Sequence, residues 1–147
     1  MPDFYDTHAH LDFPDFREEL DAVVQRAADA GISRIVTIGT EQESSLRAID
    51  LAKRFDGVFA AEGWHPNDCL AAPDDVAADL ERLAKQPKVV AIGEIGIDHY
   101  RLPSTRGGSA AEDEAFKARQ VTLFRQQLEV AAALGLHVVV HQRAAIE

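Results

Sequence analysis

The chain has 147 residues, 46% hydrophobic and 27% charged, so we expect residues 1–147 to form a single globular domain with a substantial core. The net charge of −10 argues against a broad basic face for duplex nucleic acid, and a phosphate-ester substrate would need local cations such as bound metal ions. No apolar stretch approaches the ~20 residues of a membrane span, no secretory signal is expected, and Cys69 is the only cysteine, so we predict a cytoplasmic protein without membrane contact.

Short apolar segments alternate with amphipathic segments along the chain. In chain order we expect a strand at 3–7, a helix at 16–30, a strand at 34–38, a helix at 40–55, a strand at 58–61, a helix opened by residues 73–75, a strand at 88–92, a helix at 114–134 and a strand at 137–140. Asp15 is the expected N-cap of the first helix. Thr40 and Glu43 have the spacing of a capping box and predict the start of the second helix.

The expected strands are apolar on both faces, as in RIVTI at 34–38 and VVAI at 89–92. Such strands suit a parallel sheet covered by helices, and right-handed crossovers then place the strands in sequential order. Five units in ~140 residues fit either an open doubly wound sheet or the beginning of an eight-stranded barrel, which normally needs ~250 residues. In both architectures, residues that follow the strands lie at the same rim of the sheet.

Two histidines, His8 and His10, close the first apolar segment. In an extended chain, side chains two residues apart point the same way and lie roughly 6.6 Å apart, so both imidazoles can bind one metal ion. An isolated His-x-His pair is weak evidence by itself. Histidine and carboxylate ligands gathered on one rim, however, are what a hydrolytic metal site requires.

Glu94 interrupts the apolar residues 89–97. A buried carboxylate is costly unless it is paired, hydrogen-bonded or bound to metal, and nearby glycines permit tight backbone geometry around it. We therefore expect Glu94 to be a ligand on the rim. The alternative is a structural salt bridge with Arg101 or Arg143.

His141 closes the last apolar segment, whereas His137 opens it roughly 13 Å away. Strand direction therefore selects His141 for the rim. Arg143 follows two residues later and is suited to holding an anionic group through two guanidinium nitrogens. A surface ion pair is the alternative for Arg143.

Three further side chains accompany the rim. His65 follows the third apolar segment and is expected as a ligand, a proton donor or a phosphate contact, with a structural loop histidine as the alternative. Asp6 and Asp98 are expected to orient the ligands through hydrogen bonds.

Four segments resemble the motifs of the TatD family of metal-dependent deoxyribonucleases, in order and at family-like spacing. They are DTHAHLD at 6–12, GWHP at 63–66, GEIGIDHYR at 93–101 and VVVHQRA at 138–144. The third segment is the most specific of the four. The resemblance implies an α/β fold, a parallel (β/α) TIM-type barrel truncated after about five strands.

The resemblance also implies a site and a chemistry. It carries over His8, His10, Glu94 and His141 as metal ligands, with Glu94 bridging two divalent ions and His65 near the scissile group. The implied activity is two-metal hydrolysis of DNA phosphodiester bonds. Imidazole and carboxylate ligands suit Zn²⁺, Mn²⁺ or Fe²⁺, with Mg²⁺ as an alternative where carboxylates and waters dominate.

Members of the family continue well beyond the position of Glu147, and that portion supplies a further His ligand and an Asp ligand that helps to activate water. Loss of an acid–base group costs ~10²–10⁴-fold in rate, so we expect little or no nuclease activity from residues 1–147 alone. The open edge of the sheet is expected to favour self-association. Two other functions stay open: an amidohydrolase-like enzyme acting on C–N or C–O bonds, and an inactive metal-binding or assembly fragment.

Overall fold

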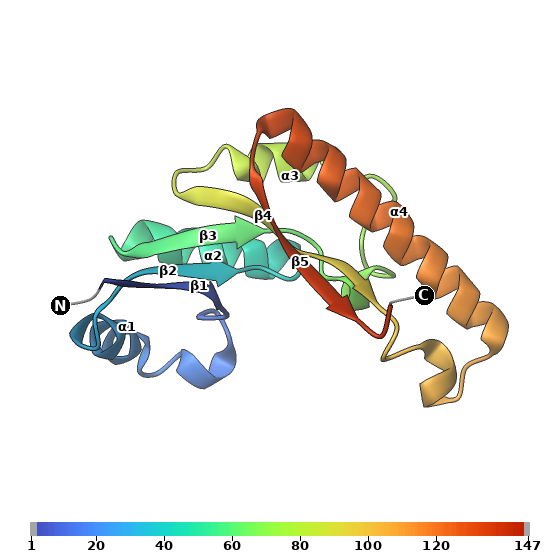
Figure 1. Ribbon diagram of the computed structural model, residues 1–147, viewed down its shortest axis with the longest axis horizontal. Helices are drawn as coiled ribbons and strands as arrows, with labels where there is room; N and C mark the ends of the chain where they lie inside the picture. The colour runs from blue at the N-terminus through green and yellow to red at the C-terminus, as the bar shows by residue number, and fades with distance from the viewer. Residues whose placement is uncertain (1–2, 146–147) are drawn as a thin grey trace.

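Five parallel strands make up the sheet of the computed structural model, which describes residues 3–145 (Figure 1). The order of the strands in the sheet is their order in the sequence. They are β1 Phe4–Ala9, β2 Ile32–Ile38, β3 Val58–Glu62, β4 Val89–Asp98 and β5 His137–Arg143. The helices between them are α1 Leu20–Asp29, α2 Gln42–Arg54, α3 Ala77–Ala84 and α4 Ala110–Leu134. The sheet curls into a half-barrel with helices along its outside, which confirms the expected α/β barrel-type fold.

The two strands that carry most of the site residues are longer than the sequence pattern predicts. β4 extends to Asp98 and β5 extends to Arg143. Parallel pairing shifts register between Ile92 and Ile95 and then continues through both extensions, with Gly96 opposite His141 and Asp98 opposite Arg143. Pairing with the neighbouring strand therefore outweighs the polar character of these residues, and it places Glu94 within the sheet instead of in a loop.

Two helices begin later than predicted. Pro14–Phe16 form a 3₁₀ turn with i→i+3 hydrogen bonds, and α1 begins only at Leu20. The prediction that Asp15 caps this helix is wrong, because the proline starts a tighter turn around it and Glu19 becomes the N-cap. Similarly, α3 begins at Ala77, after the predicted opening at 73–75.

Capping boxes begin α2 and α4. In α2 the Glu41 carboxylate accepts the Ser44 N–H at 2.6 Å, and the Ser44 hydroxyl accepts the Glu41 N–H at 3.2 Å. The predicted box is therefore one residue out of register. In α4 the side chains of Ser109 and Glu112 make the corresponding bonds at 3.3 and 2.7 Å, so this helix begins before residue 114.

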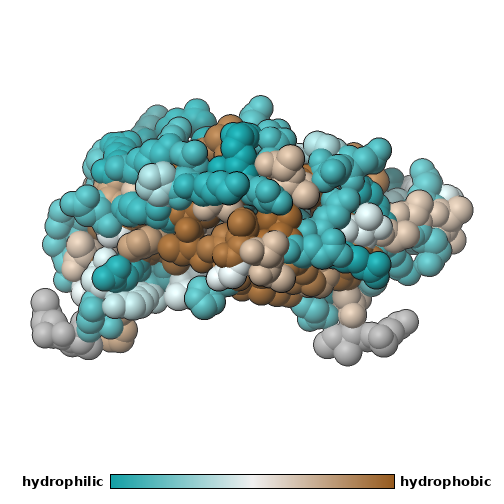
Figure 2. Space-filling view, turned by 90° about the horizontal axis from the view of Figure 1, so that it is seen from above, coloured by the Kyte–Doolittle hydropathy of each residue, from teal (hydrophilic) through white to brown (hydrophobic). Residues whose placement is uncertain are grey.

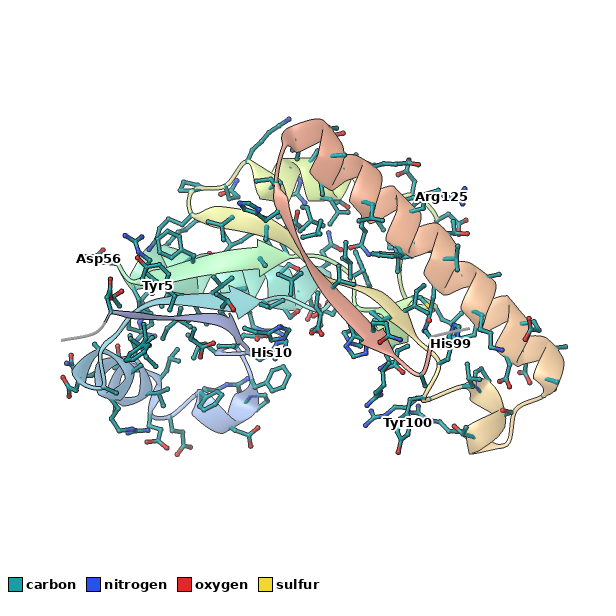
Figure 3. All side chains as sticks on the ribbon, in the orientation of Figure 1. Tyr5, His10, Asp56, His99, Tyr100 and Arg125 are labelled. Carbon is teal, nitrogen blue, oxygen red and sulfur yellow. The ribbon has the colours of Figure 1, made fainter. Side chains whose placement is uncertain are left out.

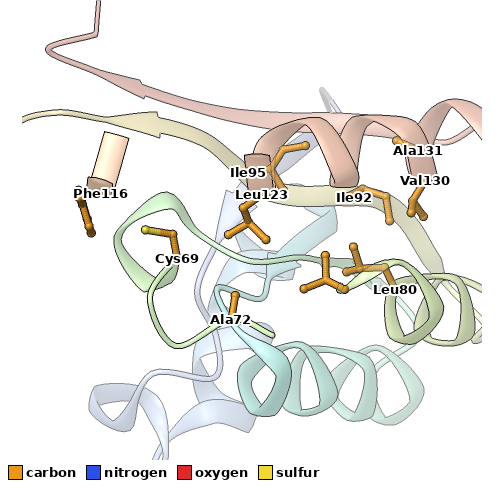
Figure 4. Packing of buried hydrophobic residues seen from close by; sticks show 10 residues of the cluster. Cys69, Ala72, Leu80, Ile92, Ile95, Phe116, Leu123, Val130 and Ala131 are labelled. Atoms are coloured by element: carbon orange, nitrogen blue, oxygen red, sulfur yellow. The ribbon is translucent and has the colours of Figure 1, made fainter. Parts of the chain in front are cut away.

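Apolar side chains on the outer face of the sheet pack against the helices in two clusters. One cluster joins Ile92 and Ile95 of β4 to Leu80 of α3 and to Leu123 and Val130 of α4 (Figure 4). The other lies between β2, β3 and the helices α1 and α2. Within residues 3–145, no helix is both long enough and apolar enough to cross a membrane.

The inner face of the sheet carries apolar side chains over which the described residues place no helix. Ile38, Ala61 and Ala91 form a small cluster there, with Val36 and Val139 packed against it. Figure 2 shows apolar residues gathered over the middle of the molecule, with hydrophilic residues around them. Ile38, Ala61 and Ala91 are themselves buried, and the partly buried Val36 and Val139 are the side chains of this cluster that reach solvent.

Glu62, at the end of β3, is a fully buried carboxylate. Neither of its oxygens has a hydrogen-bond partner within residues 3–145. Burial raises the pKa of Glu62 to about 8. The positive charge of Arg82 lowers this pKa, and the negative charge of Asp79 raises it by a smaller amount. Because the unfolded chain loses this proton near pH 4.5 and the folded chain near pH 8, folding stability falls as the pH rises through that window.

Replacement of Glu62 by leucine is expected to stabilise the chain at pH 7 by about 3 kcal/mol. Between the ordinary pKa of 4.5 and pH 7, each pH unit lowers the folding stability of the wild type by about 1.4 kcal/mol, and the leucine variant does not have this loss. The gain should shrink as the pH falls toward 4.5 and vanish below it, where the carboxyl of Glu62 is protonated in both the folded and the unfolded wild-type chain. Urea unfolding at several pH values measures both effects. Glu81→Leu, which removes an exposed carboxylate of α3, is the matched control. A pH-independent difference between Glu62→Leu and the wild type would contradict the assignment.

Candidate metal centre

Three ligand-type side chains meet where the carboxyl end of β1 faces the middle of β4. Nε2 of His8 lies 3.4 Å and Nε2 of His10 lies 3.7 Å from Oε2 of Glu94. Figure 3 labels His10 at the end of β1, where that strand turns away from the sheet. Glu94 is 8% exposed, whereas the side chain of His8 is 43% exposed, so the carboxylate is buried and the group opens to solvent on the side of His8. The structure therefore brings together the first three residues that the sequence places on the rim.

The hydrogen bonding of His10 shows that this group fits a divalent ion. Nδ1 of His10 lies 2.9 Å from the Ile38 carbonyl oxygen, so Nδ1–H donates and Nε2 presents its lone pair toward Glu94. A metal-bound histidine is commonly supported by such a bond to a backbone carbonyl. Ligand atoms held tetrahedrally at about 2.1 Å from an ion lie about 3.4 Å apart. The observed separations of 3.4 and 3.7 Å are close to that value.

Glycines beside Glu94 let β5 come close to β4. A Cβ atom on Gly96, whose φ is +145°, would lie 2.0 Å from the carbonyl oxygen of His141. A Cβ atom on Gly93 would lie 2.6 Å from the Cβ of Val139. Both positions therefore require glycine, and the close approach brings His141 beside Glu94.

His141 connects Glu94 to Asp98. Its Nδ1 lies 2.9 Å from Oε1 of Glu94, and its Nε2 lies 3.0 Å from Oδ2 of Asp98. The ring of His65 lies 4.4 Å from that of His141, and His65, Glu94 and His141 form a second group whose ligand atoms lie within 4.8 Å of one another. Glu94 thus directs one oxygen to each group. An ion in the second group would replace the direct bond between His141 and Glu94.

Asp98 is fully buried at the end of β4 and accepts hydrogen bonds from four residues. The donors are Nη2 of Arg143 at 2.7 Å, Nδ2 of Asn67 at 3.0 Å, Nε2 of His141 at 3.0 Å and the N–H of Tyr100 at 2.9 Å. Burial alone would raise the pKa of Asp98, but these donors outweigh it and lower the pKa to about 2. Asp98 is therefore ionised at neutral pH and holds Arg143, whose partner is this carboxylate and not Glu94.

His65 has the hydrogen bonding of a donor. The N–H of Asn67 donates to its Nδ1 at 3.1 Å, so the proton of the neutral ring lies on Nε2. Burial lowers the pKa of His65 to about 4, against the opposing charge of Glu94. His65 is neutral at pH 7, and its Nε2–H is better suited to a hydrogen bond with a substrate oxygen than to metal ligation.

The remaining residues considered in the sequence analysis, Asp6 and His137, lie outside the two groups of ligand-type side chains. Oδ1 of Asp6 accepts the backbone N–H of His8 at 3.0 Å, so Asp6 fixes the backbone of the ligand strand and not an imidazole ring. His137 pairs with Ala91 at the beginning of β5, at the opposite end of that strand from the rim.

Two buried glutamines of α4, which the sequence pattern does not predict, hold the backbone around the site. Gln127 accepts the Trp64 N–H at 2.7 Å and donates to the Trp64 carbonyl at 3.0 Å. Gln120 makes the same pair of bonds with the backbone of Asp98, both at 3.0 Å, and also donates to the Pro66 carbonyl at 3.1 Å. Gln120 and Gln127 are two helical turns apart and share a helix face with the buried Leu123. This spacing is the sequence signal that marks both glutamines as buried.

Replacement of Gln127 by leucine is expected to destabilise the chain by about 1–3 kcal/mol for each backbone group of Trp64 that loses its partner. Urea unfolding at neutral pH measures the loss. Gln25→Leu is the control, because Gln25 is exposed and its one side-chain hydrogen bond within residues 3–145 goes to Asp29 on the same helix. Equal losses for the two variants would mean that Gln127 does not hold this loop.

A parallel barrel-type sheet with histidine and carboxylate ligands at its carboxyl rim is the arrangement of metal-dependent hydrolase barrels. The family model of TatD related DNase matches residues 5–147, and the chain belongs to this family. This confirms the resemblance found in the four motifs.

Named relatives and solved structures agree with that membership. The chain is 33% identical over 143 residues to a protein of Bacillus subtilis named as the uncharacterized metal-dependent hydrolase YabD, covering 97% of this chain and 52% of the relative. It is 37% identical over 141 residues to the 3′-5′ ssDNA/RNA exonuclease TatD of Cronobacter turicensis, covering 96% and 49%. The crystal structure of the TatD homologue YjjV from Escherichia coli matches with a TM-score of 0.80 at 35% identity, covering 96% and 51%. The chain therefore spans about half the length of the relatives it matches.

A more distant structure supports the fold alone. An amidohydrolase of Saccharomyces cerevisiae matches with a TM-score of 0.71 at 19% identity, covering 97% of this chain and 49% of that chain.

Proposed function

We propose that the protein hydrolyses phosphodiester bonds of single-stranded nucleic acid with the help of two divalent metal ions. The observation that carries this proposal is the convergence of His8, His10 and Glu94, with separations of 3.4 and 3.7 Å between the ligand atoms. The substrate class is supported by relatives at 35–38% identity that are named as 3′-5′ ssDNA/RNA exonucleases.

In this proposal His8, His10 and one oxygen of Glu94 hold one ion, and the other oxygen of Glu94 with His141 holds the second. The bound ions supply Lewis-acid polarisation of the phosphoryl group and hydroxide near neutral pH. Glu94 fixes the spacing of the two positions, because its two oxygens already face the two groups. The ion is Zn²⁺, Mn²⁺ or Fe²⁺, since imidazole and carboxylate ligands suit these ions, with Mg²⁺ as the alternative.

His65 and Arg143 are the proposed substrate contacts. His65 offers its Nε2–H to an oxygen of the reacting phosphate or of the leaving group, where it would share developing negative charge. Arg143 is held by Asp98 through Nη2 at 2.7 Å and lies over the Tyr100 ring at 4.4 Å. Its fixed guanidinium is suited to binding an adjacent phosphate.

A single-turnover assay with the chain in excess over labelled single-stranded DNA tests the function. We expect slow cleavage with Mn²⁺ or Zn²⁺ that stops in EDTA and in Glu94→Gln. Parallel assays use RNA, lactones and cyclic amides. Metal-dependent turnover of the lactones or amides alone would assign an amidohydrolase activity instead, and no turnover of any substrate would favour an inactive metal-binding fragment.

We also propose that the open sheet edges associate with a second copy of this chain. Val138 and Val140 of the β5 edge are 40% and 53% exposed, and Tyr5 of the β1 edge is 58% exposed. Unpaired strand edges template further strands. Light scattering is expected to show dimers or larger species whose proportion rises with salt, because salt screens the net charge of −10. A strict monomer at all salt concentrations would contradict this association.

A cytoplasmic location is part of the proposal. Cys69, the sole cysteine, is fully buried, and burial raises the pKa of its thiol to about 11, which makes it unsuited to disulfide exchange. Fractionation of cells that express a tagged chain tests the location, and recovery from an extracellular fraction would contradict it.

A further inference from the structure

A pocket opens beside the candidate metal centre, between the turn that follows β3, the segment that joins β4 to α4, and α4 itself. Its volume is about 210 Å³, and its lining residues are Asn67, Leu70, Arg101, Pro103, Arg106 and Phe116. We propose that this pocket binds one phosphate group of a single-stranded nucleic acid, through Arg101 and Arg106, next to the nucleotide that is cleaved. The inference rests on the proposed function and adds to it a second point of contact with the substrate.

The two arginines of the pocket carry charges that no carboxylate neutralises. Within residues 3–145, neither Arg101 nor Arg106 makes an ion pair. Arg26, Arg47, Arg54, Arg82 and Arg143 each pair with a carboxylate. Arg17, Arg34, Arg119 and Arg125 make no ion pair within the described residues either, but of the arginines without an ion pair Arg101 and Arg106 are the two that line one pocket together. In a chain with a net charge of −10, two unneutralised guanidinium groups in one pocket form a local positive site. Guanidinium groups match the geometry of phosphate oxygens, which makes a phosphate the favoured anion.

Asn67 joins the pocket to the metal centre. Its Nδ2 donates to Oδ2 of Asp98 at 3.0 Å, and the same oxygen accepts from Nε2 of His141 at 3.0 Å. Oδ1 of Asn67 is buried and has no hydrogen-bond partner within residues 3–145. A buried acceptor without a partner is costly, and a sugar hydroxyl is a donor that would satisfy it. The unsatisfied atom therefore indicates a ligand that carries hydroxyl groups as well as charge.

The backbone holds the arginine segment in place before any ligand binds. Arg106 ends the 3₁₀ turn Pro103–Arg106, and the N–H of Gly108 donates to the Pro103 carbonyl at 2.9 Å. The side chain of Asp113 on α4 accepts the Ser104 N–H at 2.8 Å and ties the turn to the helix. A pocket fixed in this way loses little entropy when it binds an anion.

The size of the pocket limits what it holds. Its volume of about 210 Å³ is below the range of about 300–1,000 Å³ that is typical for whole small-molecule ligands. A phosphate with part of its sugar fits this volume better than a complete nucleotide with its base. We therefore expect contacts with the nucleic-acid backbone and little preference for base identity.

Fluorescence anisotropy with a labelled oligouridylate, which carries ribose 2′-hydroxyls, tests the pocket in EDTA without hydrolysis and without metal. The double variant Arg101→Ala/Arg106→Ala is expected to bind about tenfold more weakly than the wild type. The slope of log binding constant against log salt concentration should become shallower by about 0.7 for each lost phosphate contact. The matched control is Arg26→Ala/Arg125→Ala, which removes the same charge from exposed positions on α1 and α4 (Figure 3 labels Arg125). With an oligomer that has neutral methylphosphonate linkages, the two double variants should bind with equal affinity.

Equal losses in the two double variants, an unchanged salt dependence, or no binding by the wild-type chain would overturn the inference. Cleavage is measured separately with Mn²⁺. Cleavage that depends on Glu94 but not on the arginine pair would leave the proposed function standing and remove the phosphate pocket. Arginine-dependent binding without cleavage would support the pocket and contradict the proposed function.

Discussion

Replacement of Glu94 by glutamine is expected to weaken divalent-ion binding by more than about 100-fold, since loss of even an outer partner of a metal ligand commonly costs about 10–100-fold. The physical reason is that Glu94 serves both ligand groups. Oε2 faces His8 and His10, and Oε1 lies 2.9 Å from His141. An amide supplies neither the charge nor two equivalent oxygens. Titration calorimetry with Mn²⁺ or Zn²⁺ at pH 7 measures the change.

His65→Gln is the comparison variant for this experiment. Nδ1 of His65 already accepts the Asn67 N–H at 3.1 Å and its proton lies on Nε2, so we expect its loss to reduce ion affinity by less than about tenfold. Glu81→Gln, an exposed carboxylate on α3, controls for the change in net charge. Equal affinities of Glu94→Gln and His65→Gln would show that Glu94 is not the shared ligand.

Replacement of Asp98 by alanine is expected to cost about 3–5 kcal/mol of folding free energy, the usual loss when one partner of a buried ion pair is removed. Asp98 is fully buried, and its removal leaves Arg143, Asn67 and His141 without their shared acceptor. Urea unfolding at pH 7 measures this loss.

The effect of Asp98 is also expected to depend on pH. Its pKa is about 2 in the folded chain and 3.8 ordinarily, so its contribution of about 2 kcal/mol is present above pH 3.8 and is lost as the pH falls toward 2. The difference between wild type and Asp98→Ala should therefore narrow on acidification. Asp50→Ala, which removes an exposed carboxylate of α2, is the control. Equal losses for the two variants would contradict a structural role for the Asp98 network.

The sequence predicts the strand order and the helical layer because both follow from local patterns and from the handedness of crossovers. It does not predict that β4 continues through Glu94 to Asp98, because the apolar pattern breaks at the glycine before Glu94. That continuation depends on pairing with β5, a strand that lies some forty residues further along the chain in the register Asp98 opposite Arg143. The start of α1 is misplaced for a local reason, the turn begun by Pro14.

The residues of the candidate site were predictable as a set, because parallel strands bring their carboxyl ends together. Their supports were not. The Ile38 carbonyl that fixes the tautomer of His10 and the Gln127 amide that holds Trp64 belong to distant segments. Such contacts depend on strand register and on the rotation of a helix about its axis, which one-dimensional spacing does not determine. The same holds for Arg143, whose buried partner is Asp98 and not Glu94.

The most direct test of the metal centre is anomalous diffraction at the zinc edge from crystals of the chain grown with Zn²⁺. We expect a peak about 2.0–2.2 Å from Nε2 of His8, Nε2 of His10 and an oxygen of Glu94, the distances of bound zinc. A second, weaker peak is expected between Glu94 and His141. Anomalous density elsewhere on the chain, with none in reach of His8, His10 and Glu94, would contradict the metal centre.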